Sequence, residues 1–460
     1  MKFQGSRGLA AALTALALAA CGGSDDDAPP ARGTVVTGQL AGHATRAQID
    51  AGTATSGLQP LSGLAACDVD VRYVLYVTRD AQGQPQTASA GVLVPSGTDA
   101  ACTGDRPVVL YAHGTTTTKS KNMADVVNDN EAKLVMAMYA AQGFIVVAPN
   151  YLGYDQSSLN YHPYLDAETQ AGDMIDGLRA AKAHLAAAST VKPSAKLLIT
   201  GYSQGGHVAM ATHKVIERDH ASEFTVSASG PMSGPYNLVS FNDIVTGPGP
   251  INGGATIFAP LLLTSYQRAY GNIYAAPSDV YQSPYDTTAP TLFPTDTPVS
   301  QLLAENKLPQ DPTFTLLFGT GGLLKDSFRA GYATSNFRAA LKTNTLAGTD
   351  GPGGSAIGWK PAHPVALCGG AQDPTVYWSI NAPVAQGVFA AQGVAVPAFD
   401  LETRASLPAG AVGDAIYGGF QQSKAAAGTN AQAQYHGTLV PPFCSALVRG
   451  FFQQVLAAGG

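Results

Sequence analysis

The stretch Leu197-Leu198-Ile199-Thr200-Gly201-Tyr202-Ser203-Gln204-Gly205-Gly206 decides the fold class of this sequence. An apolar strand runs directly into Gly201, and the residues after Gly206 continue as a helix. The segment from Gly201 to Gly205 fits the pattern G-x-S-x-G, in which small residues flank a Ser held on a sharp turn from strand to helix. The alternative is a glycine-rich turn with an incidental Ser. The strand before the turn and the helix after it favour the first interpretation, in which Ser203 is exposed at the turn as a nucleophile.

Strands and helices alternate along the chain on both sides of this turn. Residues 70–78 and 87–95 alternate between apolar and polar and are rich in β-branched residues, which predicts an antiparallel hairpin. Apolar strands and periodic helices then follow one another, and strands buried on both faces are typical of a parallel, doubly wound sheet. Strands are expected at 107–112, 144–149, 195–200, 224–229 and 364–367, and helices at 131–142, 166–188, 204–219, 376–392 and 443–456.

The long segment 242–355 lacks this rhythm and is rich in Pro, Gly, Tyr and Thr. We expect it to be a cap inserted over the carboxyl edge of the sheet, where open α/β sheets bind ligands. Its aromatic and leucine residues either line an acyl or aryl pocket or form the core of the cap itself. The alternative is a separate domain. The core is then expected to comprise residues 36–241 and 356–460.

The first residues have the pattern of an export signal. Lys2 and Arg7 precede an apolar stretch that is too short to span a bilayer, so residues 1–20 are expected to be a removed signal peptide. Leu18-Ala19-Ala20-Cys21 resembles a bacterial lipoprotein box, which predicts acylation of Cys21; the alternative is ordinary cleavage after Ala19. Residues 21–35 are expected to be a flexible tether. Gly22 beside the Cys resembles an outer-membrane sorting signal, and the alternative is a soluble secreted protein.

Composition excludes some classes of function. The chain has 460 residues, of which 45% are hydrophobic and 13% charged, so it can bury a large core. Its net charge is −6 and no run of Lys or Arg forms a basic patch, which argues against nucleic-acid binding. No segment after the signal has the length of a membrane span. Nothing in the sequence calls for a metal or an organic cofactor.

A nucleophilic Ser needs a base within hydrogen-bond reach and an acid that orients the base. In folds with this turn the order along the chain is Ser, acid, His. His436 lies in loop-like sequence before the terminal helix and is the expected base, whereas His363 directly precedes a strand. Asp373 follows the strand at 364–367 and is the expected acid. Less ordered sequence surrounds the alternative acids, which are Asp350, Asp400 and Asp414.

The oxyanion of a tetrahedral intermediate needs backbone N–H donors. One donor is expected at Gln204, the residue after the nucleophile. The other is expected at Thr115, in the loop His113-Gly114-Thr115 that follows an early strand. His113 comes too early in the chain for the base and is expected to be structural.

Five cysteines are present, and acylation of Cys21 leaves four that can pair in three ways. Cys67 and Cys102 flank the predicted hairpin, whose ends meet. Cys368 and Cys444 lie near Asp373 and His436, whose loops must be neighbours. The expected disulfides are therefore Cys67–Cys102 and Cys368–Cys444.

Three motifs carry a family resemblance. They are Val146-Val147-Ala148-Pro149-Asn150-Tyr151-Leu152-Gly153, Asp173-Met174-Ile175-Asp176-Gly177-Leu178-Arg179-Ala180 and Gly201-Tyr202-Ser203-Gln204-Gly205-Gly206. They resemble the secretory lipase family, which includes fungal lipase A and bacterial exported esterases. The resemblance runs from about residue 105 to 240 and resumes near Asp373 and His436.

This resemblance implies an α/β-hydrolase core with a cap, cofactor-free hydrolysis of carboxylic esters, and a triad at Ser203, Asp373 and His436. Two features depart from the fungal members, in which a Gly follows the nucleophile and the first oxyanion loop is not His-Gly. Acyl-chain preference and action at oil–water interfaces are therefore not carried over.

The sequence thus predicts an exported, lipid-anchored serine ester hydrolase that acts on an acyl or aryl ester. A serine peptidase on the same fold is the enzymatic alternative. A surface-anchored binding lipoprotein without turnover is the alternative from another class.

Overall fold

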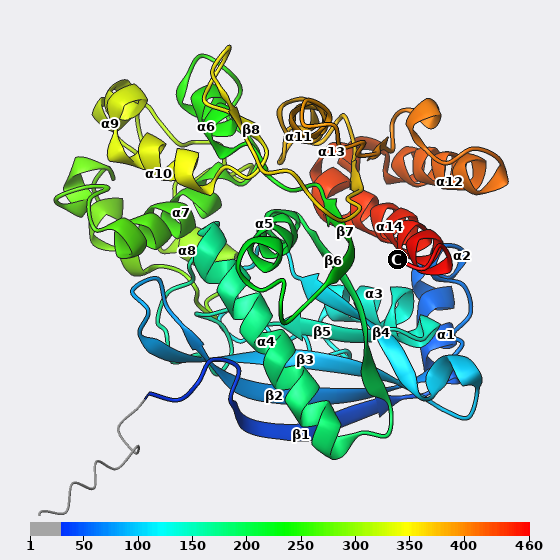
Figure 1. Cartoon of the computed structure of the whole chain (residues 1–460). Coiled ribbons are helices and arrows are strands. Elements are labelled where there is room, and N and C mark those ends of the chain that lie inside the picture. The colour runs from blue at the N-terminus through cyan, green and yellow to red at the C-terminus, as the bar shows by residue number, and fades with distance from the viewer. Residues whose placement is uncertain (1–28) are drawn as a thin grey trace, which may run out of the picture. The chain divides into compact units, whose positions relative to one another are not determined.

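A twisted, mostly parallel sheet forms the centre of the folded chain (Figure 1). The computed structural model describes residues 29–460, and within them the sheet has nine strands in the order β1-β2-β3-β5-β4-β6-β7-β10-β11. Strands β1 to β3 pair antiparallel, and the strands from β5 to β11 pair parallel. The strands are β1 (Val35–Ala44), β2 (Asp68–Arg79), β3 (Pro85–Ser96), β4 (Asp105–Ala112), β5 (Ile145–Pro149), β6 (Lys192–Tyr202), β7 (Val226–Met232), β10 (Leu367–Gly369) and β11 (Ala398–Asp400).

Helices cover both faces of this sheet because its central strands are apolar on both sides. In β4, Val108 and Leu110 belong to one core cluster, whereas Val109 and Tyr111 belong to the other. Helices α4 (Ala167–Ala188), α5 (Gln204–Asp219) and α11 (Trp378–Ala390) pack on the first face. Helices α1 (Arg46–Ser56), α3 (Asn130–Met138), α12 (Ala411–Ala427) and α14 (Val440–Ala457) pack on the second. Two short helices, α2 (Gln59–Ser62) and α13 (Ala431–Gln434), complete this part.

The fold class expected from the sequence is confirmed, and local signals explain most element boundaries. The carboxylate of Asp166 accepts the N–H of Thr169 and starts α4. Gly143, with φ of 91°, ends the helical segment that begins at Asn130. The hairpin of β2 and β3 forms as expected.

The chain between β7 and β10 builds no strand of the main sheet. Its elements are α6 (Leu238–Thr246), α7 (Ala255–Tyr270), α8 (Val299–Ala304), α9 (Asp326–Gly331), α10 (Asn336–Asn344) and the small hairpin of β8 (Gly348–Thr349) and β9 (Ala356–Ile357). Helices α6 to α10 gather at the upper left of Figure 1, away from α12 and α14 at the upper right. They share a third core cluster, to which Tyr164, Leu165 and Val376 also contribute. The expected boundaries at 242 and 355 fall inside α6 and inside the β8–β9 hairpin.

The N-terminal expectations are only partly covered by the structure. The signal peptide, Cys21 and most of the expected tether lie outside the described residues. Residues 32 and 33, at the end of the expected tether, contact the folded chain. Arg32 forms an ion pair with Asp176 at 2.8 Å, and the N–H of Gly33 donates to the carbonyl of Val77. The folded part therefore begins before residue 36. In the part of the chain that the structure describes, no helix is long and apolar enough to cross a membrane.

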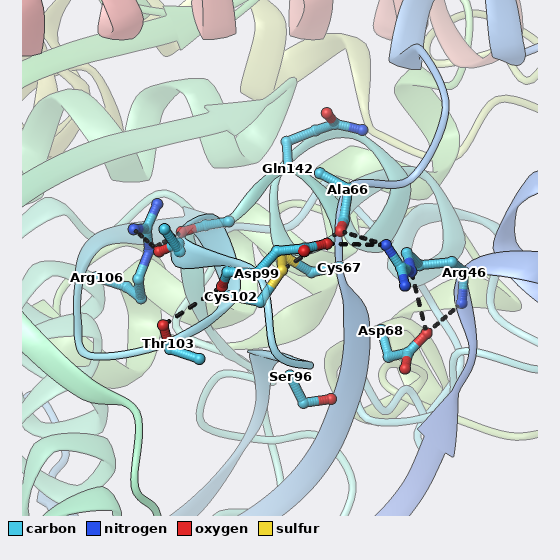
Figure 2. The surroundings of a disulfide bond; sticks show 12 residues. Arg46, Ala66, Cys67, Asp68, Ser96, Asp99, Cys102, Thr103, Arg106 and Gln142 are labelled. Carbon is cyan, nitrogen blue, oxygen red and sulfur yellow. Dashed lines mark hydrogen bonds and ion pairs between the residues drawn. A yellow bond between two sulfur atoms is a disulfide. The ribbon is translucent and has the colours of Figure 1, made fainter.

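Both disulfides expected from the sequence are present in residues 29–460. Cys67–Cys102 joins the start of β2 to the segment that follows β3 (Figure 2). Arg46 borders this bridge, and its guanidinium contacts Asp99 at 3.0 Å. Cys368–Cys444 joins β10 to α14.

Candidate active site

Ser203 occupies the turn between β6 and α5, as the sequence predicts. Its backbone has φ of 59° and ψ of −122°, which an L-residue other than Gly rarely adopts. Close packing holds this turn, because a Cβ at Gly205 would lie 1.9 Å from the carbonyl oxygen of Ala112 and one at Gly201 would lie 2.4 Å from it. The two glycines therefore let the helix approach the sheet, and the side chain of Ser203 is left at the beginning of α5.

The structure brings Ser203, His436 and Asp373 into one hydrogen-bonded chain. The Oγ of Ser203 lies 2.8 Å from Nε2 of His436, and Nδ1 of His436 lies 2.6 Å from Oδ2 of Asp373. Since a carboxylate only accepts, Nδ1 carries the proton and Nε2 is free to accept from the hydroxyl. The side chain of His436 is 13% exposed and that of Asp373 is 1% exposed. The hydroxyl thus faces a base with a lone pair.

Asp373 is fixed by the turn that it begins. Its Oδ1 accepts the N–H groups of Thr375 at 2.8 Å and Val376 at 3.0 Å, so the other oxygen is directed to His436. The remaining acids that the sequence left open have other partners. Asp350 pairs with Arg338 and Lys342, Asp400 accepts the N–H of Ala371, and Asp414 pairs with Arg404.

His436 is not in a loop, contrary to the sequence-based expectation. It lies in a π-helical turn, Tyr435–Leu439, that continues directly into α14. The carbonyl of His436 accepts a hydrogen bond from the hydroxyl of Tyr202 at 2.6 Å, which ties the base to the nucleophile turn. Gly437 makes the sequence around His436 resemble a loop. In the structure, Gly437 lies within the π-helical turn.

Tyr435 links the turn that carries His436 to the turn that carries Asp373. Its hydroxyl donates to Glu402 at 2.8 Å and accepts the N–H of Gln372 at 3.4 Å, one residue before Asp373. Burial, together with the Glu402 carboxylate, raises the pKa of Tyr435 well above its usual value, so the hydroxyl keeps its proton. The sequence motifs do not indicate this pair. The position of Tyr435 beside His436 was its only signal.

The two expected oxyanion donors lie beside Ser203. Gln204 is the first residue of α5, so its N–H has no partner within the helix. The loop after β4 approaches from the other side, where a Cβ at Gly114 would lie 3.8 Å from Cβ of Ser203. The N–H of Gly114 donates to Glu131 at 2.9 Å, and Thr115 lines the same cavity as Ser203. Thr115 therefore stays the predicted second donor.

His113 is buried and lies between two backbone carbonyls, those of Gly114 and Asn150. Burial lowers its pKa. Its ring nitrogens face these carbonyls and not Ser203 or Asp373, and a structural role stays the expectation for it.

Two cavities meet at Ser203. The first is an open groove of about 1660 Å³ between α1, α3, the start of α14 and α7, and it includes Ser203, His436 and Thr115. The second is a narrow space of about 90 Å³ that enters the segment between β7 and β10. Its walls are mainly apolar and include Leu238, Phe241, Leu262, Leu263, Phe318 and Phe337. Phe258 borders both cavities.

One cluster in the described residues has the donor types of a metal site, namely His213, Glu217 and His363. Oε1 of Glu217 already accepts from both imidazoles, at 2.8 and 2.9 Å, and from two backbone N–H groups. Although burial opposes ionisation, these hydrogen bonds lower the pKa of Glu217 to about 2. These hydrogen bonds connect the end of α5 to the segment before β10, which accounts for the cluster without a metal ion. It lies about 20 Å along α5 from Ser203.

Known proteins show where this architecture recurs. A family model described as the prolyl oligopeptidase family matches residues 130–231. No curated protein matches the sequence. Among solved structures, the rice cell wall degrading esterase LipA from Xanthomonas oryzae is 31% identical, with a TM-score of 0.70, and the match covers 81% of this chain and 91% of LipA.

Two more distant structures share the fold. A candidate hydrolase from Legionella pneumophila is 23% identical over 92% of this chain and 98% of its own, with a TM-score of 0.70. Candida antarctica lipase A is 14% identical over 80% of this chain and 76% of its own, with a TM-score of 0.55. The LipA match covers most of both chains, at 81% of this chain and 91% of LipA. The chain therefore belongs to the α/β-hydrolase family of esterases and lipases.

Proposed function

We propose that this protein hydrolyses carboxylic esters through an acyl-enzyme on Ser203. The observation that carries the proposal is the chain from Ser203 through His436 to Asp373, with distances of 2.8 and 2.6 Å. Such an arrangement activates a hydroxyl that is otherwise a weak nucleophile.

The reaction has two halves. Nε2 of His436 takes the proton of Ser203 as Oγ bonds to the ester carbonyl carbon, and the carbonyl oxygen becomes an oxyanion that accepts from the N–H groups of Gln204 and Thr115. The oxyanion collapses, the bond to the alcohol breaks, and the alcohol leaves with the proton from His436. Water then gives a proton to His436 and attacks the acyl carbon. The acid leaves, and Ser203 regains its proton. Asp373 orients the imidazole and stabilises its cation.

Each of the two cavities suits a different part of the ester substrate. The narrow apolar cavity, of about 90 Å³, suits the acyl chain and limits the length of that chain. A short acyl group fits this space. The open groove suits a bulky alcohol portion. LipA is a cell wall degrading esterase, and this similarity supports an ester of a large alcohol, such as a polymer, as the substrate class. In this proposal the segment from α6 to β9 acts as the cap.

A serine peptidase is the second candidate, because the prolyl oligopeptidase model matches the region around Ser203. The same fold and triad cleave amides as well as esters. The match covers 130–231 only, whereas the esterase LipA matches most of the chain. The ester hydrolase is therefore the better supported function.

A substrate panel tests the proposal. We expect p-nitrophenyl acetate and butyrate to be hydrolysed faster than the octanoate and laurate, and aminoacyl arylamides to be hydrolysed slowly or not at all. Ser203→Ala should lower kcat by about 10⁴ to 10⁶, since the triad acts as a unit. Faster cleavage of the arylamides would favour the peptidase. Retention of more than about a tenth of the activity by Ser203→Ala would end the assignment of the nucleophile.

We also propose that the protein is exported and anchored by a lipid on Cys21, in the outer membrane. The other four cysteines form disulfides, which are typical of oxidising compartments, and Cys21 is left for acylation. Expression in a Gram-negative host should give a membrane-associated protein, and Cys21→Ser should release it. A wild-type protein found wholly in the soluble fraction would contradict the anchor.

A further inference from the structure

The segment between β5 and α4, residues 151–164, places four buried aromatic side chains against the nucleophile turn. We propose that this segment, through His162, Tyr151, Tyr154 and Tyr164, holds the two oxyanion donors at their working positions. This inference rests on the proposed function, because it assigns positioning residues to the same site. The four side chains act on Gln204 and on the loop His113 to Thr116, and none of them belongs to the triad.

His162 fixes the side chain of Gln204. The N–H at Nδ1 of His162 donates to the carbonyl of Leu152 at 2.8 Å, so Nε2 is the acceptor. The amide nitrogen of Gln204 donates to Nε2 at 2.6 Å. The amide oxygen of Gln204 is buried and has no partner among the described residues, so this amide is oriented by its bond to His162, whose Nε2 also lies 3.3 Å from the amide nitrogen of Gln170.

Two further facts support a fixed acceptor. His162 is 1% exposed, and burial lowers its pKa to about 3, so the ring stays neutral at the pH at which an ester hydrolase with a His base works. Gln204 is itself 1% exposed and begins α5. Because the side chain and the backbone N–H of Gln204 share one Cα, holding the amide restrains the direction in which this N–H points.

Three tyrosines hold the other donor. The hydroxyl of Tyr151 donates to the carbonyl of His113 at 2.9 Å, and that of Tyr154 donates to the carbonyl of Thr116 at 2.6 Å. The hydroxyl of Tyr164 lies 2.9 Å from Oγ1 of Thr115. Thr115 is thus held through its own side chain and through both flanking segments of the loop.

The rings of this segment connect the two sides. Tyr151 stacks on His113 with ring centroids 4.0 Å apart and on His162 at 5.5 Å, and Tyr154 meets His162 at 4.7 Å. Tyr151 has φ of 67°, a conformation that costs free energy in a residue other than Gly. A strained residue in a fully buried stack indicates that the surrounding structure fixes its position. One segment therefore couples the Gln204 side of the site to the Thr115 side.

The chemical consequence is a specific loss of rate when the segment is altered. Removal of one oxyanion donor lowers kcat by about 10² to 10³, and a misplacement of about 1 Å can cost about 10². A displaced donor should lower kcat while leaving the binding of the neutral ester nearly unchanged, since the charge forms only in the transition state.

Two single variants and a matched control test this inference. His162→Phe keeps a ring in the stack and removes the acceptor of Gln204. Tyr154→Phe removes the hydrogen bond to Thr116. The control is Tyr139→Phe, which removes a buried tyrosine hydroxyl that donates to the carbonyl of Ser445 at 3.3 Å on the opposite face of the sheet. Tyr164 is not used, because it also lines the narrow cavity.

We expect His162→Phe and Tyr154→Phe to lower kcat on p-nitrophenyl butyrate by about 10- to 100-fold, with KM changed by less than about threefold. The dissociation constant of an alkyl boronic acid, which forms an anionic tetrahedral adduct on Ser203, should rise by a similar factor. Tyr139→Phe should lower the melting temperature as much as Tyr154→Phe does and leave kcat within about twofold.

A double-mutant cycle tests whether His162 affects kcat through the side chain of Gln204. If His162 acts through Gln204, His162→Phe should have little further effect on kcat in a Gln204→Leu background. If His162→Phe lowered kcat equally in the wild type and in Gln204→Leu, the proposal that His162 acts through Gln204 would be overturned. Unchanged kcat and boronate affinity in a folded His162→Phe or Tyr154→Phe protein would overturn the inference. If His162→Phe fails to fold, Tyr154→Phe decides. A wild-type protein that hydrolyses no ester would instead contradict the proposed function, so the two failures are distinct.

Discussion

Asp173 lies on α4, next to the segment 151–164, and its carboxyl group is almost completely buried. Its Oδ1 lies 2.9 Å from the hydroxyl of Tyr76, and its Oδ2 accepts the N–H of Leu152 at 2.8 Å. Burial raises the pKa of Asp173 to about 7, and the neighbouring Asp176 adds to the shift. The folded protein therefore keeps a proton on Asp173 at pH values where the unfolded chain, with a pKa of about 3.9, has lost it.

This linkage has a definite sign. Between about pH 4 and pH 7 the folded state binds more protons at Asp173 than the unfolded state, so the contribution of Asp173 to the free energy of unfolding falls as the pH rises through that window. Above about pH 7 the loss is complete and amounts to a few kcal/mol. Asp173→Asn copies the protonated form, since its amide can donate to Tyr76 and its oxygen can accept from Leu152.

We therefore predict a pH-dependent gain in stability for Asp173→Asn. Thermal melts should show nearly equal melting temperatures for the variant and the wild type at pH 4.5, and a higher melting temperature for the variant at pH 8. Taking the difference at each pH removes the contribution of the other titrating groups. A difference that does not change between pH 4.5 and pH 8 would contradict the raised pKa.

Among the elements, the two disulfides are predicted to differ in what they do. Cys368–Cys444 joins β10, five residues before Asp373, to α14, eight residues after His436. Cys67–Cys102 lies at the hairpin, near Arg46 and Asp99, and touches no residue of the triad (Figure 2). The first bridge therefore restrains the acid against the base, while the second restrains only the fold.

We expect replacement of Cys368 and Cys444 by Ser to lower both the melting temperature and kcat. Replacement of Cys67 and Cys102 by Ser should lower the melting temperature alone. The loops span 76 and 35 residues, for which the chain-entropy model gives an upper contribution of about 4 kcal/mol each. Melting curves and initial rates of the two double variants measure these effects. A normal kcat in the folded Cys368→Ser, Cys444→Ser protein would show that the bridge does not position the triad.

Elements with strong periodicity could be predicted from the sequence, and weaker ones could not. The boundaries of α5 are those that the sequence predicts, because an elbow, an apolar face and a run of helix formers coincide there. Strand β1 was missed, since its outward side chains are mostly exposed and Gly38 and Gly42 interrupt the pattern. It forms only because β2 offers an edge. Helix α12 was missed for a similar reason, as few of its residues are buried.

On the scale of the whole molecule, the site forms where distant segments meet. Ser203, Asp373 and His436 were predictable because the chemistry of a triad restricts the residue types and their order along the chain. The segment 151–164 was not recognised, although its aromatic density was visible in the sequence. Its role depends on hydrogen bonds to backbone atoms of another loop, and such partners leave no pattern in the sequence.

The segment between β7 and β10 could be located from the sequence in outline, and its role as a cap stays a prediction. A loss of strand–helix rhythm shows where an insertion lies, yet the boundaries depend on packing. Helix α6, which begins at Leu238, joins the third core cluster, so the packing unit extends four residues before the expected boundary at residue 242. The narrow cavity is formed by side chains from α6, α7 and the segments that follow them, and its volume could not be derived from composition.

Ser203 is proposed to be an activated nucleophile, and covalent labelling by a fluorophosphonate is the direct test of this role. A fluorophosphonate forms a P–O bond with an activated Ser hydroxyl as its P–F bond breaks, and the hydroxyl proton leaves with fluoride as HF. We expect the intact protein to gain the mass of one label, peptide mapping to place the label on Ser203, and ester hydrolysis to fall in proportion to labelling. Ser203→Ala should remain unlabelled. A wild-type protein that hydrolyses esters but takes no label, or takes it on another residue, would contradict the account.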